Sequence, residues 1–221
     1  MNCNFFELIS LEPRYQGAFA DDTFLRELQS VADMVASEHG TISCQFRKSV
    51  DPDYPNRLLF IASWDNIEAH DQFDIKGLTP KILKIILKHL TPIASYFMYL
   101  DSSRVDFSAP ICQAAVYHVR PGQAPLFQRQ IDANPGLAGS WYITKKMPPL
   151  PAVTPRDPEE LRLLEEGRRR AEDRLRAPNP EIWISLTTPG SPTERLGRMV
   201  EGYAREVQTG RYQIFIQGRK L

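Results

Sequence analysis

The chain has 221 residues, enough to bury a core as one large domain or two small ones, and 42% of them are hydrophobic, as in a soluble globular protein. Lys and Arg together number 27, as do Asp and Glu, so no net charge draws in nucleic acid or an anionic membrane. With no apolar run near the roughly 18 residues of a membrane helix, no signal-like N-terminus and three separated cysteines, the composition predicts a cytoplasmic protein with reduced thiols.

The first half alternates between strand and helix patterns. Apolar residues recur at helical spacing after Asp21, while the residues from Thr41 alternate between apolar and polar. In chain order the predicted elements are a strand at 4–13, a helix at 21–40, strands at 41–50 and 57–64, helices at 66–74 and 80–90, and a strand at 93–101. This order, β-α-β-β-α-β, predicts a ferredoxin-like unit.

The second half repeats the order with less regularity. The predicted elements are a strand at 111–119, a helix at 124–134, strands at 139–146 and 181–189, a helix at 191–210 and a strand at 211–219. An insertion at about 147–180 opens with a proline-rich stretch and continues as a charged helix, which we interpret as a solvated helix capping a surface or a subunit contact. We therefore predict an α+β fold with one unit at 1–106 and a second at 107–221.

One short stretch carries a resemblance to a known family. A strand ends in Trp64, a helix then begins with Glu68-Ala69-His70, Phe73 follows, and Leu90-Thr91-Pro92 precedes the last strand. Over roughly residues 3–106 this pattern resembles the antibiotic biosynthesis monooxygenase family of the dimeric α+β barrel superfamily. Members pair two single units into a barrel. The resemblance thus implies an intramolecular barrel, a pseudo-dimer, with further homo-oligomerisation left open.

Sheet packing agrees with that implication. A four-stranded sheet with helices on one face needs cover on the other, and a second sheet supplies it at about 10 Å. We expect the facing surfaces to be apolar or aromatic. The residues assigned to these surfaces are Phe5, Phe46, Tyr117, Trp183 and Phe215.

The resemblance also implies a chemistry, cofactor-independent monooxygenation of a hydrophobic aromatic or polyketide-like small molecule. Such an enzyme needs an apolar pocket, a base that forms the phenolate and donors that hold oxyanions. We predict that His70 is the acid/base residue and that Trp64 supplies an indole N–H and a flat wall. Phe60, Phe73 and Tyr96 are predicted to line the same cavity. No cofactor or metal is implied.

Departures from the family pattern keep other interpretations open. Quinone-forming members carry asparagine at the position of Phe60 and tyrosine at the position of His70, and haem-degrading members carry their histidine at the position of Asp74. An acid/base cyclase or isomerase on the same barrel is one alternative. A non-catalytic ligand-binding or scaffold subunit, whose second half lacks a site, is another. Core packing alone would also explain Trp64 and His70.

Other chemistries find little support in the sequence. There is no glycine-rich phosphate loop and no nucleophile elbow. His70 with Asp71 and Asp74 could offer metal ligands, but we expect ligands on one helical turn to converge poorly, so no metal site is predicted. His89 lies in a lysine-bearing helix, where we expect it to be exposed.

Overall fold

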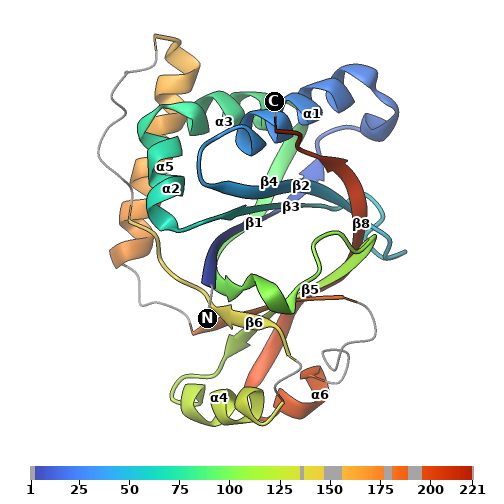
Figure 1. Ribbon diagram of the computed structural model, residues 1–221, viewed down its shortest axis with the longest axis vertical. Helices are drawn as coiled ribbons and strands as arrows, with labels where there is room; N and C mark the ends of the chain where they lie inside the picture. The colour runs from blue at the N-terminus through green and yellow to red at the C-terminus, as the bar shows by residue number, and fades with distance from the viewer. Residues whose placement is uncertain (1–2, 135–136, 147–155, 177–180, 189–195, 221) are drawn as a thin grey trace.

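The computed structural model describes residues 3–134, 137–146, 156–176, 181–188 and 196–220. Its antiparallel strands form one continuous sheet in the order β4-β1-β3-β2-β8-β5-β7-β6 (Figure 1). The strands are β1 (Cys3–Pro13), β2 (Thr41–Ser49), β3 (Leu58–Trp64), β4 (Leu90–Asp101), β5 (Ile111–Val119), β6 (Gly139–Trp141), β7 (Ile182–Thr187) and β8 (Ala204–Gln217). The helices are η1 (Ala18–Ala20), α1 (Asp22–Ala36), α2 (Ile67–Ile75), α3 (Leu78–His89), η2 (Ser102–Arg104), α4 (Ala124–Asp132), α5 (Pro158–Arg176) and α6 (Leu196–Val200).

The sheet uses the same strand order twice. Counted from the first strand of each half, β4-β1-β3-β2 and β8-β5-β7-β6 both read fourth, first, third, second. This is what two β-α-β-β-α-β units produce, so the predicted α+β fold is confirmed. The division at residues 106 and 107 stays a prediction.

The two sets of strands join at both of their edges. At one junction β2 pairs with β8, with Phe46 opposite Ile216. At the other, an isolated bridge links Met98 of β4 to Tyr142, and the Ile143 amide donates to the Phe97 carbonyl at 2.8 Å. Each junction brings the second strand of one half to the fourth strand of the other. The sheet therefore closes into one intramolecular barrel, which leaves little free strand edge.

The barrel interior is filled by side chains from both halves. Its buried residues are Phe6, Leu8, Leu59, Ile61, Met98, Leu100, Cys112, Ala114, Val116, Ile182, Ile184, Leu186 and Tyr212. The assignment of Phe5, Phe46, Tyr117, Trp183 and Phe215 to this surface is wrong, because all five pack on the helix-covered side of the sheet. Neighbouring residues of a strand point to opposite faces, and here both faces are apolar, so the pattern does not reveal which is inside.

Helices cover the outside of the barrel on two opposite sides (Figure 1). The helices α1, α2 and α3 lie on one side, and α4 and α6 on the other. The Asp21 side chain begins α1 by accepting the amide of Thr23 at 2.8 Å. The helix α5, which belongs to the insertion, lies along α3 with Leu163 and Leu164 buried. Within the described ranges, none of the helices has the length and hydropathy that crossing a bilayer requires.

The helix predicted at 191–210 is wrong in its second part. Residues 191–195 lie outside the described residues, α6 ends at Val200, and the chain from Ala204 onward is strand β8. Ala204 pairs with Val119 of β5 and Glu206 pairs with Tyr117, with a bulge beyond them. Tertiary pairing with β5 therefore overrides the local helix preference of this stretch.

Candidate functional site

The junction between β3 and α2 positions the two residues singled out in the sequence. Asn66 ends the turn after β3, and its side-chain oxygen accepts the amide of Ala69 at 2.9 Å, which starts α2. Gly40 has a φ of 82°, and a Cβ at that position would lie 2.5 Å from the Ala69 Cβ, so α2 is held close to the α1–β2 turn. This position of α2 directs the His70 side chain toward the sheet. His70 is 4% exposed there, and it lies beside Trp64, which is 1% exposed.

Aromatic rings surround the His70 imidazole. Its ring centroid lies 5.2 Å from Trp64, 5.4 Å from Phe5 and 5.7 Å from Phe97, all in edge-on contact. Phe73, one turn further along α2, packs edge-on against Trp64 at 5.4 Å. The structure thus brings His70, Trp64 and Phe73 together.

The other two predicted pocket residues lie apart from this group. Phe60 is on the helix-facing side of β3 and packs against Phe46 with 5.0 Å between ring centroids. Tyr96 belongs to the barrel interior, where it contacts Tyr142 at 6.2 Å between ring centroids. The sheet therefore separates Tyr96 from His70.

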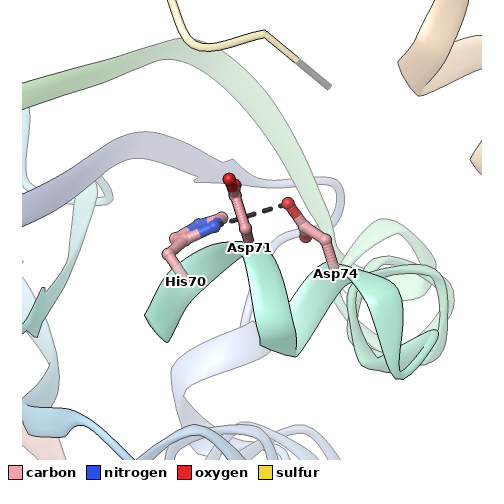
Figure 2. A group of neighbouring side chains, drawn as sticks. All are labelled: His70, Asp71 and Asp74. Carbon is pink, nitrogen blue, oxygen red and sulfur yellow. Dashed lines mark ion pairs between the residues drawn. The ribbon is translucent and has the colours of Figure 1, made fainter. Parts of the chain in front are cut away.

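Ionisable side chains converge on the opposite edge of the imidazole. Lys145, from the segment after β6, places its Nζ 2.7 Å from His70 Nδ1, 2.5 Å from Asp74 Oδ2 and 2.8 Å from Asp71 Oδ1. Glu7 of β1 lies on the other side, with its Oε2 3.4 Å from His70 Nε2. Figure 2 shows His70, Asp71 and Asp74 projecting from α2, with the ion pair between His70 and Asp74 marked. The cluster reaches solvent through Asp71 and Glu7, whose side chains are 30% and 18% exposed.

The expectation that ligands from this helical turn would converge poorly is wrong. One donor atom each from His70, Asp71 and Asp74 lies within 4.8 Å of the other two. Residues four apart on a helix share a face, which brings His70 and Asp74 together, and Asp71 leans over the same turn. The cation between these donors is the Lys145 ammonium, so the donor set is already occupied by a protein group.

The proton affinities in the cluster are set by opposing effects. Burial alone would lower the pKa of His70, but hydrogen bonds and negative charge from Asp74 and Glu7 outweigh it and raise the pKa to about 9. Burial would raise the pKa of Asp74, and its bonds to His70 and Lys145 instead hold it well below the usual range. The Asp74 carboxylate therefore stays ionised beside His70 and Lys145.

The contact between Lys145 and His70 limits how many protons the two side chains can carry together. Two nitrogens 2.7 Å apart form a hydrogen bond only when one of them offers a lone pair. The observed geometry therefore corresponds to the His70–Lys145 pair with one proton removed. In that state Lys145 donates to His70 Nδ1, and the Nε2–H of His70 faces Glu7.

The Trp64 indole contributes an unused donor. Its Nε1 is buried and has no hydrogen-bond partner among the described residues. A buried N–H without a partner costs about 1–3 kcal/mol, so such groups are rare in proteins and call for an explanation. A ligand oxygen would supply the missing acceptor.

Glu7 and Lys145 were not predicted. Glu7 had a weak signal, since it is the one charged residue inside an otherwise apolar stretch of its strand, from Phe5 to Ile9. Lys145 had none, because its position depends on how the second half closes the barrel beside β4.

No protein-family profile matches the chain. Over 117 residues, 52% of the chain, it is 25% identical to ectonucleoside triphosphate diphosphohydrolase 4 of Mus musculus, and it spans only about a fifth of that protein, 19%.

Several solved structures share the fold of the whole chain but little of its sequence. An anthrone oxidase-like protein matches 99% of the chain and 95% of its own length with a TM-score of 0.58 and 10% identity. A candidate monooxygenase of Fusobacterium nucleatum matches the same shares with a TM-score of 0.57 and 8% identity. A candidate chlorite dismutase matches 97% of the chain and 96% of its own length with a TM-score of 0.56 and 10% identity. At these identities the likeness establishes a shared fold, the α+β barrel.

Proposed function

We propose that the chain is a monooxygenase-like enzyme that acts on a hydrophobic aromatic or polyketide-like small molecule without a bound cofactor. The observation that carries this proposal is the His70–Lys145 pair, held on the buried Asp74 carboxylate beside a Trp64 indole N–H that has no partner among the described residues. Support also comes from the fold, which an anthrone oxidase-like protein and a candidate monooxygenase share. The same fold hosts many chemistries, so the proposal rests on the residues of the site.

The first step is removal of a proton from the substrate. A phenol has a pKa of about 10, close to the raised pKa of His70 at about 9, so proton transfer between them is nearly balanced. The proton is accepted at His70 Nδ1, whose lone pair becomes free when the Lys145 ammonium turns from it toward Asp71 and Asp74. Glu7, opposite Nε2, holds the ring in place for this transfer. The product is an electron-rich phenolate or its carbanion form.

The second step is reaction with dioxygen. For an activated CH2 group the balance is CH2 + O2 → C=O + H2O, so the substrate itself supplies the electrons that reduce oxygen. The carbanion forms a C–O bond, the protonated peroxide then loses its O–O bond, and the carbon-bound proton leaves with the departing oxygen as water. The Trp64 N–H is the donor for the oxyanion, and the His70–Lys145 pair returns the proton.

The pH dependence of kcat/KM tests the assignment of His70. The active form is the deprotonated pair, so kcat/KM should rise with pH along a limb whose apparent pKa lies near 9 rather than near the ordinary value of 6.5. In Glu7→Gln, one negative charge beside Nε2 is lost, so the limb should move to lower pH. A limb near 6.5 in both proteins would show that the Glu7–His70 cluster does not supply the base.

A cyclase or isomerase on the same site remains the second candidate. The observation that favours it is the same His70–Lys145 pair, which can remove a proton from one carbon and return it to another without oxygen. Turnover of the substrate under nitrogen separates the two, because only the cyclase or isomerase would continue. Unchanged turnover without oxygen would overturn the monooxygenase proposal.

A further inference from the structure

Lys145 differs from the other lysines of the chain in its burial and in its partners. It is 8% exposed, and it is the one buried lysine among the described residues. Three other lysines, Lys76, Lys84 and Lys88, lie at the surface and pair with carboxylates. The Lys145 ammonium contacts carboxylates too, but its Nζ also lies 2.7 Å from a base, His70 Nδ1. An amine within hydrogen-bond reach of a base is the arrangement that makes a lysine nucleophilic.

The junction that closes the barrel holds Lys145 in place. Two residues before it, the Ile143 amide donates to the Phe97 carbonyl at 2.8 Å. The Lys145 Nζ lies 5.9 Å from the centre of the Phe97 ring and 2.5 Å from Asp74 Oδ2. The Lys145 side chain is 4% exposed, so protein groups rather than water surround the amine. The amine is therefore positioned before a ligand arrives, which lowers the entropic cost of a reaction there.

His70 can take the proton that prevents Lys145 from reacting. An ammonium has no lone pair, so a lysine attacks carbon only after it loses a proton. The hydrogen bond from Nζ to His70 Nδ1 is the path for that transfer. Asp74 Oδ2 lies 2.5 Å from Nζ and 3.4 Å from Nδ1, so the positive charge stays beside the same carboxylate when the proton moves. Glu7, whose Oε2 is 3.4 Å from Nε2, stabilises the imidazolium that results.

We propose that Lys145 is a nucleophile that forms an imine with the aldehyde or ketone group of an aromatic small molecule. The balance is R–NH3⁺ + O=C → R–NH⁺=C + H2O, where R is the Lys145 side chain. His70 first removes a proton from the ammonium, and the neutral amine then forms an N–C bond to the carbonyl carbon. The imidazolium returns its proton to the oxygen, the C–O bond breaks, and water leaves. Neither dioxygen nor a reductant takes part, so this inference does not depend on the monooxygenase reaction.

The surroundings of the amine favour a small, flat carbonyl compound. The Phe97 ring beside Nζ is only partly buried, and Tyr99, on the same face of β4, is 37% exposed. Both rings offer an apolar surface on which an aromatic ligand can stack. The way in from solvent passes Asp71, whose side chain is 30% exposed and contacts Nζ at 2.8 Å. Rotation of this side chain toward water uncovers the amine without moving the backbone.

Reductive trapping under nitrogen, with benzaldehyde as the probe, tests the proposal on the full chain. Sodium cyanoborohydride delivers hydride to the imine carbon and leaves a stable secondary amine, which peptide mass spectrometry assigns to a particular lysine. Lys146 is exposed and adjoins Lys145 in the chain, so it is the internal reference. In the folded wild type, Lys145 should be labelled about tenfold or more faster than Lys146, because His70 removes its proton. In urea the two rates should become equal, since unfolding separates Lys145 from His70.

Two variants assign the faster labelling to His70. His70→Gln should lower the labelling rate of Lys145 about tenfold or more and leave that of Lys146 unchanged. His89→Gln, the matched control, removes a buried imidazole outside this cluster and should change neither rate. Circular dichroism reports whether each variant is folded, and the comparison of Lys145 with Lys146 in the wild type needs no substitution.

A buried ammonium that only pairs with carboxylates would give the opposite result, with Lys145 labelled more slowly than exposed Lys146. The proposal is overturned if Lys145 is labelled no faster than Lys146 in the folded wild type. It is also overturned if His70→Gln and His89→Gln label Lys145 at the same rate.

Discussion

The His70→Gln variant is expected to oxidise an electron-rich tricyclic phenol, such as a dihydroxyanthrone, about 10²–10⁴-fold more slowly than the wild type, as kcat/KM. Glutamine approximates the size of the imidazole and keeps an N–H that can face Glu7, but it cannot accept the substrate proton. Oxygen uptake and quinone absorbance, corrected for the uncatalysed reaction, measure the effect. The free energy of unfolding in urea reports whether the variant is folded.

His89→Gln provides the matched control. His89 is also buried, at 6% exposed, and also contacts a carboxylate, that of Glu27, but it lies at the end of α3 against Tyr15 and Phe24, outside the His70–Lys145 cluster. The control should keep the wild-type rate. A His70→Gln protein with wild-type activity, or equal losses in the two variants, would remove His70 from the reaction.

The Asp74→Ala variant is expected to lose about 3–5 kcal/mol of unfolding free energy. Asp74 lies beneath two bases, with its Oδ2 2.5 Å from Lys145 Nζ and 3.4 Å from His70 Nδ1, and the Lys145 side chain is only 4% exposed. Without this carboxylate, a buried ammonium loses its nearest anion. The Thr79 hydroxyl also loses its acceptor on Asp74. Urea unfolding followed by circular dichroism measures the loss.

Two further variants separate charge from packing in this prediction. Asp74→Ala/Lys145→Met removes both charges and should recover a large part of the loss, because no uncompensated ion is left buried. Asp71→Ala should cost less than about 1 kcal/mol, since the Asp71 side chain is 30% exposed and its ion pair with Lys145 is screened by water. Equal losses in Asp71→Ala and Asp74→Ala would contradict the view that Asp74 is the main anion of the cluster.

The fold was predictable because its signals are local. Caps such as Asp21, the helical spacing after it and the strand alternation repeat in a recognisable order. The inside of the barrel was not predictable, since β3 is buried along its whole length and Phe5 and Phe6 are both apolar. In such strands a shift of one residue exchanges the two faces without changing the pattern.

The difference between local signals and tertiary contacts also explains which residues of the site could be predicted. His70 and Trp64 could be proposed from the sequence because they flank one junction and belong to one short motif. Lys145 was missed because it meets His70 across 75 residues of sequence, through a contact that exists only once the barrel is closed. The prediction that His89 is exposed failed for the same reason, since Tyr15 and Glu27 cover it from positions 74 and 62 residues away. Propensity describes neighbours in sequence, whereas these contacts are set by tertiary structure.

Turnover of a dihydroxyanthrone under isotopically labelled oxygen gas, with the protein freed of metals by a chelator, tests the central claim most directly. On the proposed mechanism the His70–Lys145 pair needs only the substrate and oxygen. We therefore expect one labelled atom in the product carbonyl, the other in water, and a rate unchanged by added flavin, nicotinamide or metal ions. Product without label, or turnover that appears only after one of these additions, would contradict cofactor-independent monooxygenation at this site.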